Sequence, residues 1–194
     1  RFYFSGGHFG YQFKGPDGSV TGQSRAAGVF SCNPDGTDVR IEGQGGINPV
    51  EIEFTDTGEM LSTCAIYDSY GGRHDALIHW IHGGLTQRVY GLPLLHDTGY
   101  RLPATSRWGQ VAPAGLVRYR GKHFGDPYKD SLFACHFNTH KVVHVRLKKS
   151  GSTFITEEED FISSSSIDFH PTDILEDADG SLLLLDTGGW LSWG

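Results

Sequence analysis

The sequence NPVEIEFTDTG at residues 48–58 recurs as HPTDILEDADG at residues 170–180. Both stretches have Pro in second place, an acidic residue fourth, Ile fifth and Gly eleventh, and both continue into an apolar run. A third copy begins with APAGL at residues 112–116, where a longer turn precedes the apolar run. The prolines of the three copies are 64 and 58 residues apart. Repetition at such a period is typical of β-propellers, whose four-stranded blades need about 40–50 residues.

Each copy has the pattern of a strand, a glycine-containing turn and a second strand. Glycine tolerates positive φ in the turn, and proline is tolerated where a strand begins. A further hairpin is predicted over residues 29–41, around the turn NPDG. One sheet of this kind cannot cover both of its faces, so it needs a neighbour on each side. Hairpins alone would also allow a β-sandwich, but the long-period repeat favours the propeller.

The predicted fold is all-β: a partial β-propeller of about three to four four-stranded antiparallel blades, belonging to a larger, six-bladed ring. Blade-like units are expected at residues 1–27, 28–66, 67–137 and 138–194. Residues 156–161 are the one possible helix, but the run EEED inside them is more typical of a solvated loop. Because the chain starts and stops in apolar sequence, without initiator Met or signal peptide, we expect it to be a fragment.

The composition of the 194 residues excludes some functions. Glycine, at 27 residues, is about twice as frequent as usual, which indicates turns and short strands. The formal net charge of −7, without a basic stripe, argues against a nucleic-acid partner and against contact with an anionic membrane surface. No apolar run is long enough to cross a membrane. The absence of G-x-S-x-G, Walker and dinucleotide-binding motifs disfavours hydrolase, kinase and nicotinamide chemistry.

Three cysteines, Cys32, Cys64 and Cys135, lie far apart in the sequence. Neither C-x-x-C nor the haem-attachment motif C-x-x-C-H occurs. The odd number fits either three buried thiols or one disulfide with a remaining thiol, and free cysteine is often a small core residue.

The first polar residues of each innermost propeller strand can point into the central channel. In two copies these are Asn48 with Glu51 and His170 with Asp173, whereas the middle copy has Ala112 and Gly115 at the same places. We predict His170 as a catalytic base, because imidazole titrates near neutral pH, with Asp173 orienting it. In the alternative, His170 caps the strand and Asp173 only bonds backbone N–H groups.

Further candidates follow at the ends of other strands. Cys64, His136 and Asp186 occupy one position after the repeat turn, and His136 and Asn138 lie at a strand end and its loop, where propellers place binding groups. Arg73 could clamp a carboxylate through its guanidinium. The predicted cofactor-binding residues are therefore Asn48, Glu51, Arg73, His136 and Asn138. His74 and His82 could share a strand face, but two histidines without a clear carboxylate make a weak metal site, and none is predicted.

Five motifs together carry a family resemblance: SCNPDGT, GRHD, APAGL, HPTDILEDADGS and DTGGW, starting at residues 31, 72, 112, 170 and 186. In these the chain resembles, over nearly its whole length, the large membrane-bound dehydrogenases of Planctomycetes and Verrucomicrobia, also described as haem-binding proteins. That family resembles soluble quinoprotein sugar dehydrogenases in its propeller, and its members continue into helical repeats and a c-type cytochrome domain. The resemblance implies pyrroloquinoline quinone and calcium as cofactors, with c-type haem only outside this segment.

Two functions are therefore expected as alternatives. The first is an extracytoplasmic or periplasmic oxidoreductase that oxidises a sugar or alcohol with a quinone cofactor and passes electrons to the cytochrome domain of the parent chain. Its partners would be the substrate, the remaining blades and that domain, and the isolated segment would be inactive. The second is a non-catalytic propeller of the NHL type that binds a protein or glycan. Basic and imidazole groups converging on a pocket would favour the first, and a flat polar face the second.

Overall fold

The computed structural model describes residues 1–24, 27–68, 72–86 and 100–189. Three sheets have four strands each, and their strands are, in spatial order, β1 (Phe2–Gly6), β4 (Gly28–Cys32), β5 (Arg40–Gln44) and β9 (Gly84–Leu85); β6 (Asn48–Phe54), β7 (Met60–Asp68), β8 (Gly72–Trp80) and β10 (Ser106–Gly109); and β11 (Pro113–Arg118), β12 (Leu132–His136), β13 (Lys141–Ser150) and β14 (Thr153–Ser163). Two hairpins, β15 (Pro171–Glu176) with β16 (Leu182–Asp186) and β2 (Tyr11–Lys14) with β3 (Val20–Ser24), complete the described strands.

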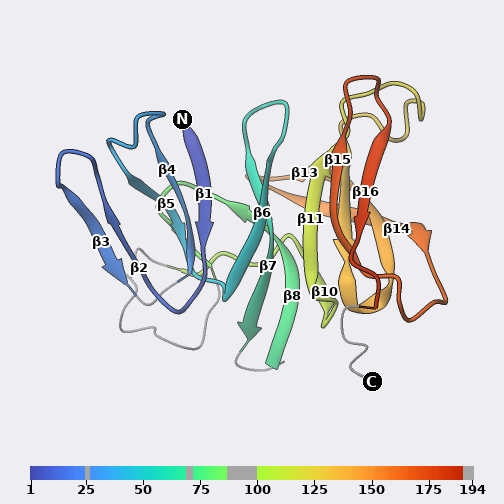
Figure 1. The fold of residues 1–194 in the computed structure, drawn as a ribbon, viewed down its shortest axis with the longest axis horizontal. Coiled ribbons are helices and arrows are strands. Elements are labelled where there is room, and N and C mark those ends of the chain that lie inside the picture. Colours follow the sequence, from blue (N-terminus) through green and yellow to red (C-terminus); the bar gives the residue numbers. More distant parts are fainter. Residues whose placement is uncertain (25–26, 69–71, 87–99, 190–194) are drawn as a thin grey trace.

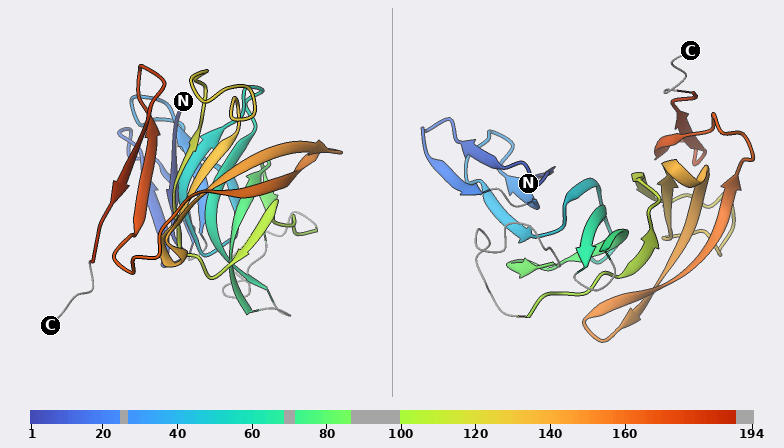
Figure 2. Two further views of the ribbon diagram at one scale, coloured as in Figure 1. Left: turned by 90° about the vertical axis from the view of Figure 1, so that its right-hand side faces the viewer. Right: turned by 90° about the horizontal axis from the view of Figure 1, so that it is seen from below.

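The sheets stand side by side like the blades of a fan (Figures 1 and 2). Their first strands β1, β6, β11 and β15 are innermost, and each contacts the next one along the chain. The chain therefore forms part of a β-propeller, as the repeat predicts. All pairings within the sheets are antiparallel except that of β5 with β9, which is parallel. Within residues 28–66, β4 and β5 belong to one sheet, and β6 and β7 belong to the next.

The three repeat copies occupy equivalent places in three adjacent sheets. Pro49, Pro113 and Pro171 lie at the start of β6, β11 and β15, and they pair with Cys64, His136 and Asp186, respectively. An irregularity of the register follows each proline. The alignment of the copies made from sequence is therefore the alignment of the strands in space.

The turns predicted from sequence share one geometry. Gly18, Gly36, Gly58 and Gly180 have φ values of 80°, 81°, 85° and 82°, which is the left-handed region that glycine adopts without a steric penalty. Each donates its N–H to the carbonyl oxygen three residues earlier, over 2.9–3.1 Å. Local sequence thus fixes these hairpins before any sheet packs against another.

Apolar side chains fill the spaces between neighbouring sheets. Leu61 and Leu77 of the β6–β10 sheet pack against Leu116 and Leu132 of the β11–β14 sheet. A second cluster around Val29, Ile66 and Trp80 joins the first two sheets, and a third joins β11–β14 to the last hairpin. Burial between sheets, rather than within one, stabilises the assembly.

The prediction for residues 156–161 is wrong, because they are neither a helix nor a loop but lie within β14. The acidic run is stable as a strand because basic side chains of β13 face it. Arg146 contacts Glu159 at 2.8 Å, Lys141 contacts Asp160 at 2.7 Å, and Lys148 is hydrogen-bonded to Glu157. Opposite charges across an antiparallel pair stabilise it, whereas a single strand of acids would repel itself.

All three cysteines are free and buried, so the interpretation as buried thiols is confirmed. Burial raises the pKa of Cys64 to about 12. Burial, with the negative charges of Asp173 and Glu51, does the same for Cys135. Since the thiolate is the reactive form, both thiols are held in their unreactive state.

We therefore expect Cys64 and Cys135 to resist iodoacetamide in the native protein at pH 8 and to react fully once it is unfolded in guanidinium chloride. Mass spectrometry of timed samples measures the labelling at each cysteine separately. Labelling of either thiol in the native protein at the rate of a free cysteine would contradict the packing described.

Gly115 lets the innermost strands approach each other. A Cβ atom built there would lie 2.6 Å from the Cα atom of Asp173 in β15 and 2.8 Å from the carboxylate oxygen Oδ1 of that residue. The nearest of these atoms belongs to backbone, which cannot rotate away. Two equivalent residues in the flanking repeat copies, Glu51 and Asp173, carry carboxylates. The glycine between them is thus a requirement of close packing.

Gly115→Ala should lower the free energy of unfolding by about 1–3 kcal/mol, because the added methyl group must push β11 and β15 apart. Urea denaturation measures the change. Gly151→Asn is the matched control: its φ of 62° is tolerated by Asn and its Cβ would meet no atom within 4 Å. An Ala variant as stable as the unmodified protein would refute the close approach.

Candidate functional site

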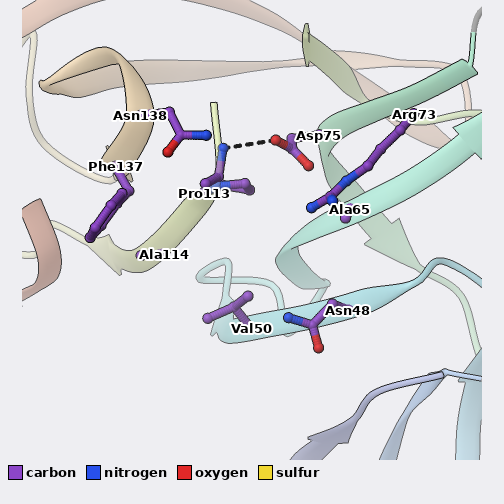
Figure 3. A pocket seen from close by; sticks show the side chains of 10 residues that line it. Asn48, Val50, Ala65, Arg73, Asp75, Pro113, Ala114, Phe137 and Asn138 are labelled. Carbon is purple, nitrogen blue, oxygen red and sulfur yellow. Dashed lines mark hydrogen bonds between the residues drawn. The ribbon is translucent and has the colours of Figure 1, made fainter. Parts of the chain in front are cut away.

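A pocket of about 410 Å³ opens where β6 and β11 begin, between two neighbouring sheets (Figure 3). Its volume lies in the range of small-molecule sites. Three segments supply polar or aromatic groups to it: β6 gives Asn48, β8 gives Arg73 and Asp75, and the 3-10 helix η2 (Phe137–Thr139) gives Phe137 and Asn138. The rest of the wall is apolar, formed by Val50, Ala65, Ala112, Pro113 and Ala114. Three predicted cofactor-binding residues, Asn48, Arg73 and Asn138, therefore meet in one cavity.

Asp75 is the residue of this pocket that sequence analysis missed. Its side chain is buried, with 1% of the residue exposed. Its Oδ2 accepts a hydrogen bond of 2.8 Å from the backbone N–H of Ala112, which has an unusual φ of 48°. Its Oδ1 is buried without a hydrogen-bond partner among the described residues. A signal existed in the sequence, because Asp75 is two residues after Arg73 and alternate residues of a strand share a face.

Arg73 and Asp75 lie on one side of the pocket, with Asn138 and Phe137 on the other (Figure 3). Arg73 is exposed at the rim, whereas Asp75 is buried. The pocket thus offers a guanidinium and two amides as donors, and a carboxylate as acceptor. This mixture suits a polar ligand with both hydrogen-bond donors and acceptors.

His170 lies behind Phe137 rather than in the pocket wall. The two rings stack at 4.3 Å between centroids, with planes 14° apart, and Nδ1 of His170 lies 3.2 Å from the carbonyl oxygen of Phe137. This carbonyl can only accept, so Nδ1 carries the proton and Nε2 of a neutral imidazole keeps its lone pair. The His170 backbone N–H donates to Asp186 over 2.8 Å, and the ring of His140 is 4.9 Å away.

Asp173 contacts the backbone of its own strand. Its Oδ1 accepts a hydrogen bond of 2.8 Å from the backbone N–H of Ile174 and lies over Gly115. The contacts that orient the His170 ring come from Phe137 instead. Across the bare glycine, Asp173 faces Glu51: burial first, then the charges of Asp173 and Glu53, raise the pKa of Glu51.

His136 is separated from Asn138 although only two residues divide them. It lines a second pocket of about 380 Å³, between the β10 end of one sheet and β13–β14 of the next. There its ring lies 4.6 Å from that of Trp108. Burial lowers the pKa of His136 to about 4, outweighing the nearby acids, so the imidazole is neutral at physiological pH.

The described part of the chain holds no metal-binding cluster. Within residues 1–24, 27–68, 72–86 and 100–189, no three His, Cys, Asp or Glu side chains gather as a metal site would require. His82, one member of the weak histidine pair, instead contacts Glu42 at 2.8 Å. In the same ranges there is no helix with the length and apolar character of a membrane span.

Glu51→Gln should stabilise the protein at neutral pH. A carboxyl whose pKa is raised on folding is destabilising once it ionises, so the gain appears above the unfolded pKa near 4.5 and is lost as the pH falls below it. Thermal unfolding from about pH 3.5 to 7.5 measures this. Asp56→Asn, in an exposed turn, is the control for removal of one charge. A gain that is independent of pH would show that ionisation of Glu51 is not its cause.

Known proteins share the architecture of this chain. Residues 93–187 match the family model of a domain of unknown function, DUF7133. No curated protein matches the sequence significantly. The PQQ-bound aldose sugar dehydrogenase of Streptomyces coelicolor is 14% identical with a TM-score of 0.59, over 91% of this chain and 56% of that one. The fold is that of a propeller.

Two further structures agree. An oxidoreductase of Thermus thermophilus, described as a glucose dehydrogenase, is 16% identical with a TM-score of 0.58, over 89% of this chain and 57% of its own. The holo PQQ domain of pyranose dehydrogenase from Coprinopsis cinerea is 14% identical with a TM-score of 0.55, over 83% of this chain and 58% of its own. The chain thus spans little more than half the length of these three propellers, and at such identities the likeness concerns the fold.

Proposed function

We propose that this chain is part of a propeller oxidoreductase that oxidises a sugar or related alcohol with a quinone cofactor. The pocket beside His170 carries the proposal, because it places a guanidinium, two amides and a carboxylate next to an imidazole with an available nitrogen. A concave site of this kind favours the oxidoreductase over an NHL-type propeller that binds through a flat polar face. The propeller likeness to proteins described as sugar dehydrogenases agrees with it.

His170 is the proposed general base. Its Nδ1–H is held by the Phe137 carbonyl oxygen at 3.2 Å, which leaves Nε2 to take the proton of a substrate hydroxyl. Stacking on Phe137 fixes the ring plane. We assign the orientation of the base to Phe137 rather than to Asp173, which contacts the backbone of Ile174. Asp173 and Glu51 would act on the site only through their negative charge.

The described residues fit a quinone cofactor at one edge. Arg73, Asn48 and Asn138 would hold one of its carboxylates, since a guanidinium binds a carboxylate bidentately. Asp75, Glu51 and Asp173 repel further carboxylates, so the remaining contacts would come from elsewhere in the parent chain. When bound, the quinone supplies the acceptor for hydride from the substrate carbon. His136 faces another pocket, and we assign it no contact with the cofactor.

The finer parts of the proposal rest on the family resemblance. Calcium would take its ligands from outside the described residues, which hold no cluster suited to it. Electrons would pass to a c-type cytochrome domain of the parent, in an extracytoplasmic compartment.

The test is dye reduction by the full-length parent protein, loaded with pyrroloquinoline quinone and calcium and supplied with a panel of sugars and alcohols. His170→Gln should lower kcat about 100-fold or more, because general-base catalysis contributes about 10²–10⁴-fold. His82, exposed beyond the end of β8, is the matched position, and His82→Gln should leave kcat unchanged. Absence of cofactor-dependent reduction together with absence of tight quinone binding would reject the proposal.

A further inference from the structure

We infer that Asp75 accepts a hydrogen bond from a ligand hydroxyl and thereby selects neutral polyols over sugar acids. The inference deepens the proposed function and rests on it for the substrate class. It adds a specificity-determining residue that lies in the pocket but outside the set predicted from sequence.

The Asp75 carboxylate is satisfied at only one of its two oxygens. Oδ2 accepts from the backbone N–H of Ala112 at 2.8 Å. The other oxygen, Oδ1, is buried and has no partner in the part of the chain that the structure describes. Leaving a buried charged acceptor unsatisfied is costly, and such a group in a folded protein calls for an explanation. A donor brought by the ligand is one that the position of Asp75 in the pocket wall supports.

The wall around Asp75 combines polar and apolar groups in the way that a polyol needs. Asn48 and Asn138 carry amides that donate and accept, Arg73 donates only, and Phe137 offers an aromatic ring. A hydroxyl can donate to Asp75 while accepting from an amide, so a polyol satisfies both kinds of group at once. Apolar carbons of the alanine and proline side chains face the rest of the cavity, as the C–H faces of a sugar ring require.

The buried charge of Asp75 disfavours an anionic ligand. Asp75 is 1% exposed, so water screens its charge poorly. A ligand carboxylate near it would add a second negative charge and no proton to donate. Arg73 could attract such an anion, but it is exposed at the rim, where its charge is screened by solvent. The buried end of the pocket therefore discriminates in favour of neutral hydroxyl groups.

Asp75→Asn is the decisive variant, because it keeps the acceptor for Ala112 and replaces the unpartnered oxygen by a donor of the same size. Binding of methyl α-D-glucopyranoside and of D-glucuronate to the full-length protein, without quinone, is measured by calorimetry. Nitrogen NMR of alanine-labelled protein reports binding through the Ala112 amide, whose hydrogen bond goes to Asp75. The unmodified protein should prefer the glucoside. The variant should bind it about tenfold more weakly, the loss expected for one hydrogen bond to a charged group, and lose most of the preference.

Asp56→Asn removes one charge in an exposed turn and should leave both affinities unchanged. Thermal unfolding checks that each variant is folded, and Asn48→Ala, which leaves the Asp75–Ala112 bond intact, should weaken both ligands to a similar extent. The inference is overturned by preference for glucuronate, by unchanged glucoside binding in the Asp75 variant, or by no sugar binding at all. Since no step uses the quinone, failure here is distinguishable from failure of dye reduction.

Discussion

The hydrogen bond from the Ala112 N–H to the Asp75 carboxylate joins two sheets at the place where the pocket opens. Asp75 comes from β8 of one sheet, and Ala112 leads into β11, the innermost strand of the next. Ala112 has a φ of 48°, a conformation that a residue with a Cβ atom adopts only when its surroundings hold it there. The buried carboxylate provides that constraint. The entry of β11, and with it the pocket wall, depends on this one contact.

The pocket arises because a repeated frame is unequally filled. Three innermost strands begin in the same way, with a proline paired to the end of the second strand. At equivalent positions, two copies carry Asn48 and His170, and the middle copy has Ala112. Further along, Gly115 stands where its neighbours have Glu51 and Asp173. The small residues of the middle strand leave space, and the polar groups of its neighbours surround that space.

The electrostatics of the inner and outer strands differ for a physical reason. Near the innermost strands, Glu51 and Asp173 face each other across a residue without a side chain, so burial and repulsion raise the pKa of Glu51. Further out, the acids of β14 meet the bases of β13 and are neutralised in exposed ion pairs. Charge is therefore concentrated toward the propeller axis, where a ligand can exploit it, and compensated at the outer edge of the blade.

Much of the frame was predictable from local sequence, and so were the polar residues that begin each innermost strand. Turn glycines, strand-initial prolines and the equivalence of Cys64, His136 and Asp186 follow from the repeat, because each depends on neighbouring residues and on strand periodicity. Tertiary structure decided the rest. The acidic run at residues 157–160 suits a strand only because β13 brings basic side chains opposite it. Asn48, Arg73 and Asn138 share a cavity with Asp75, and His136 faces another, because neighbouring sheets pack through side chains far apart in the chain.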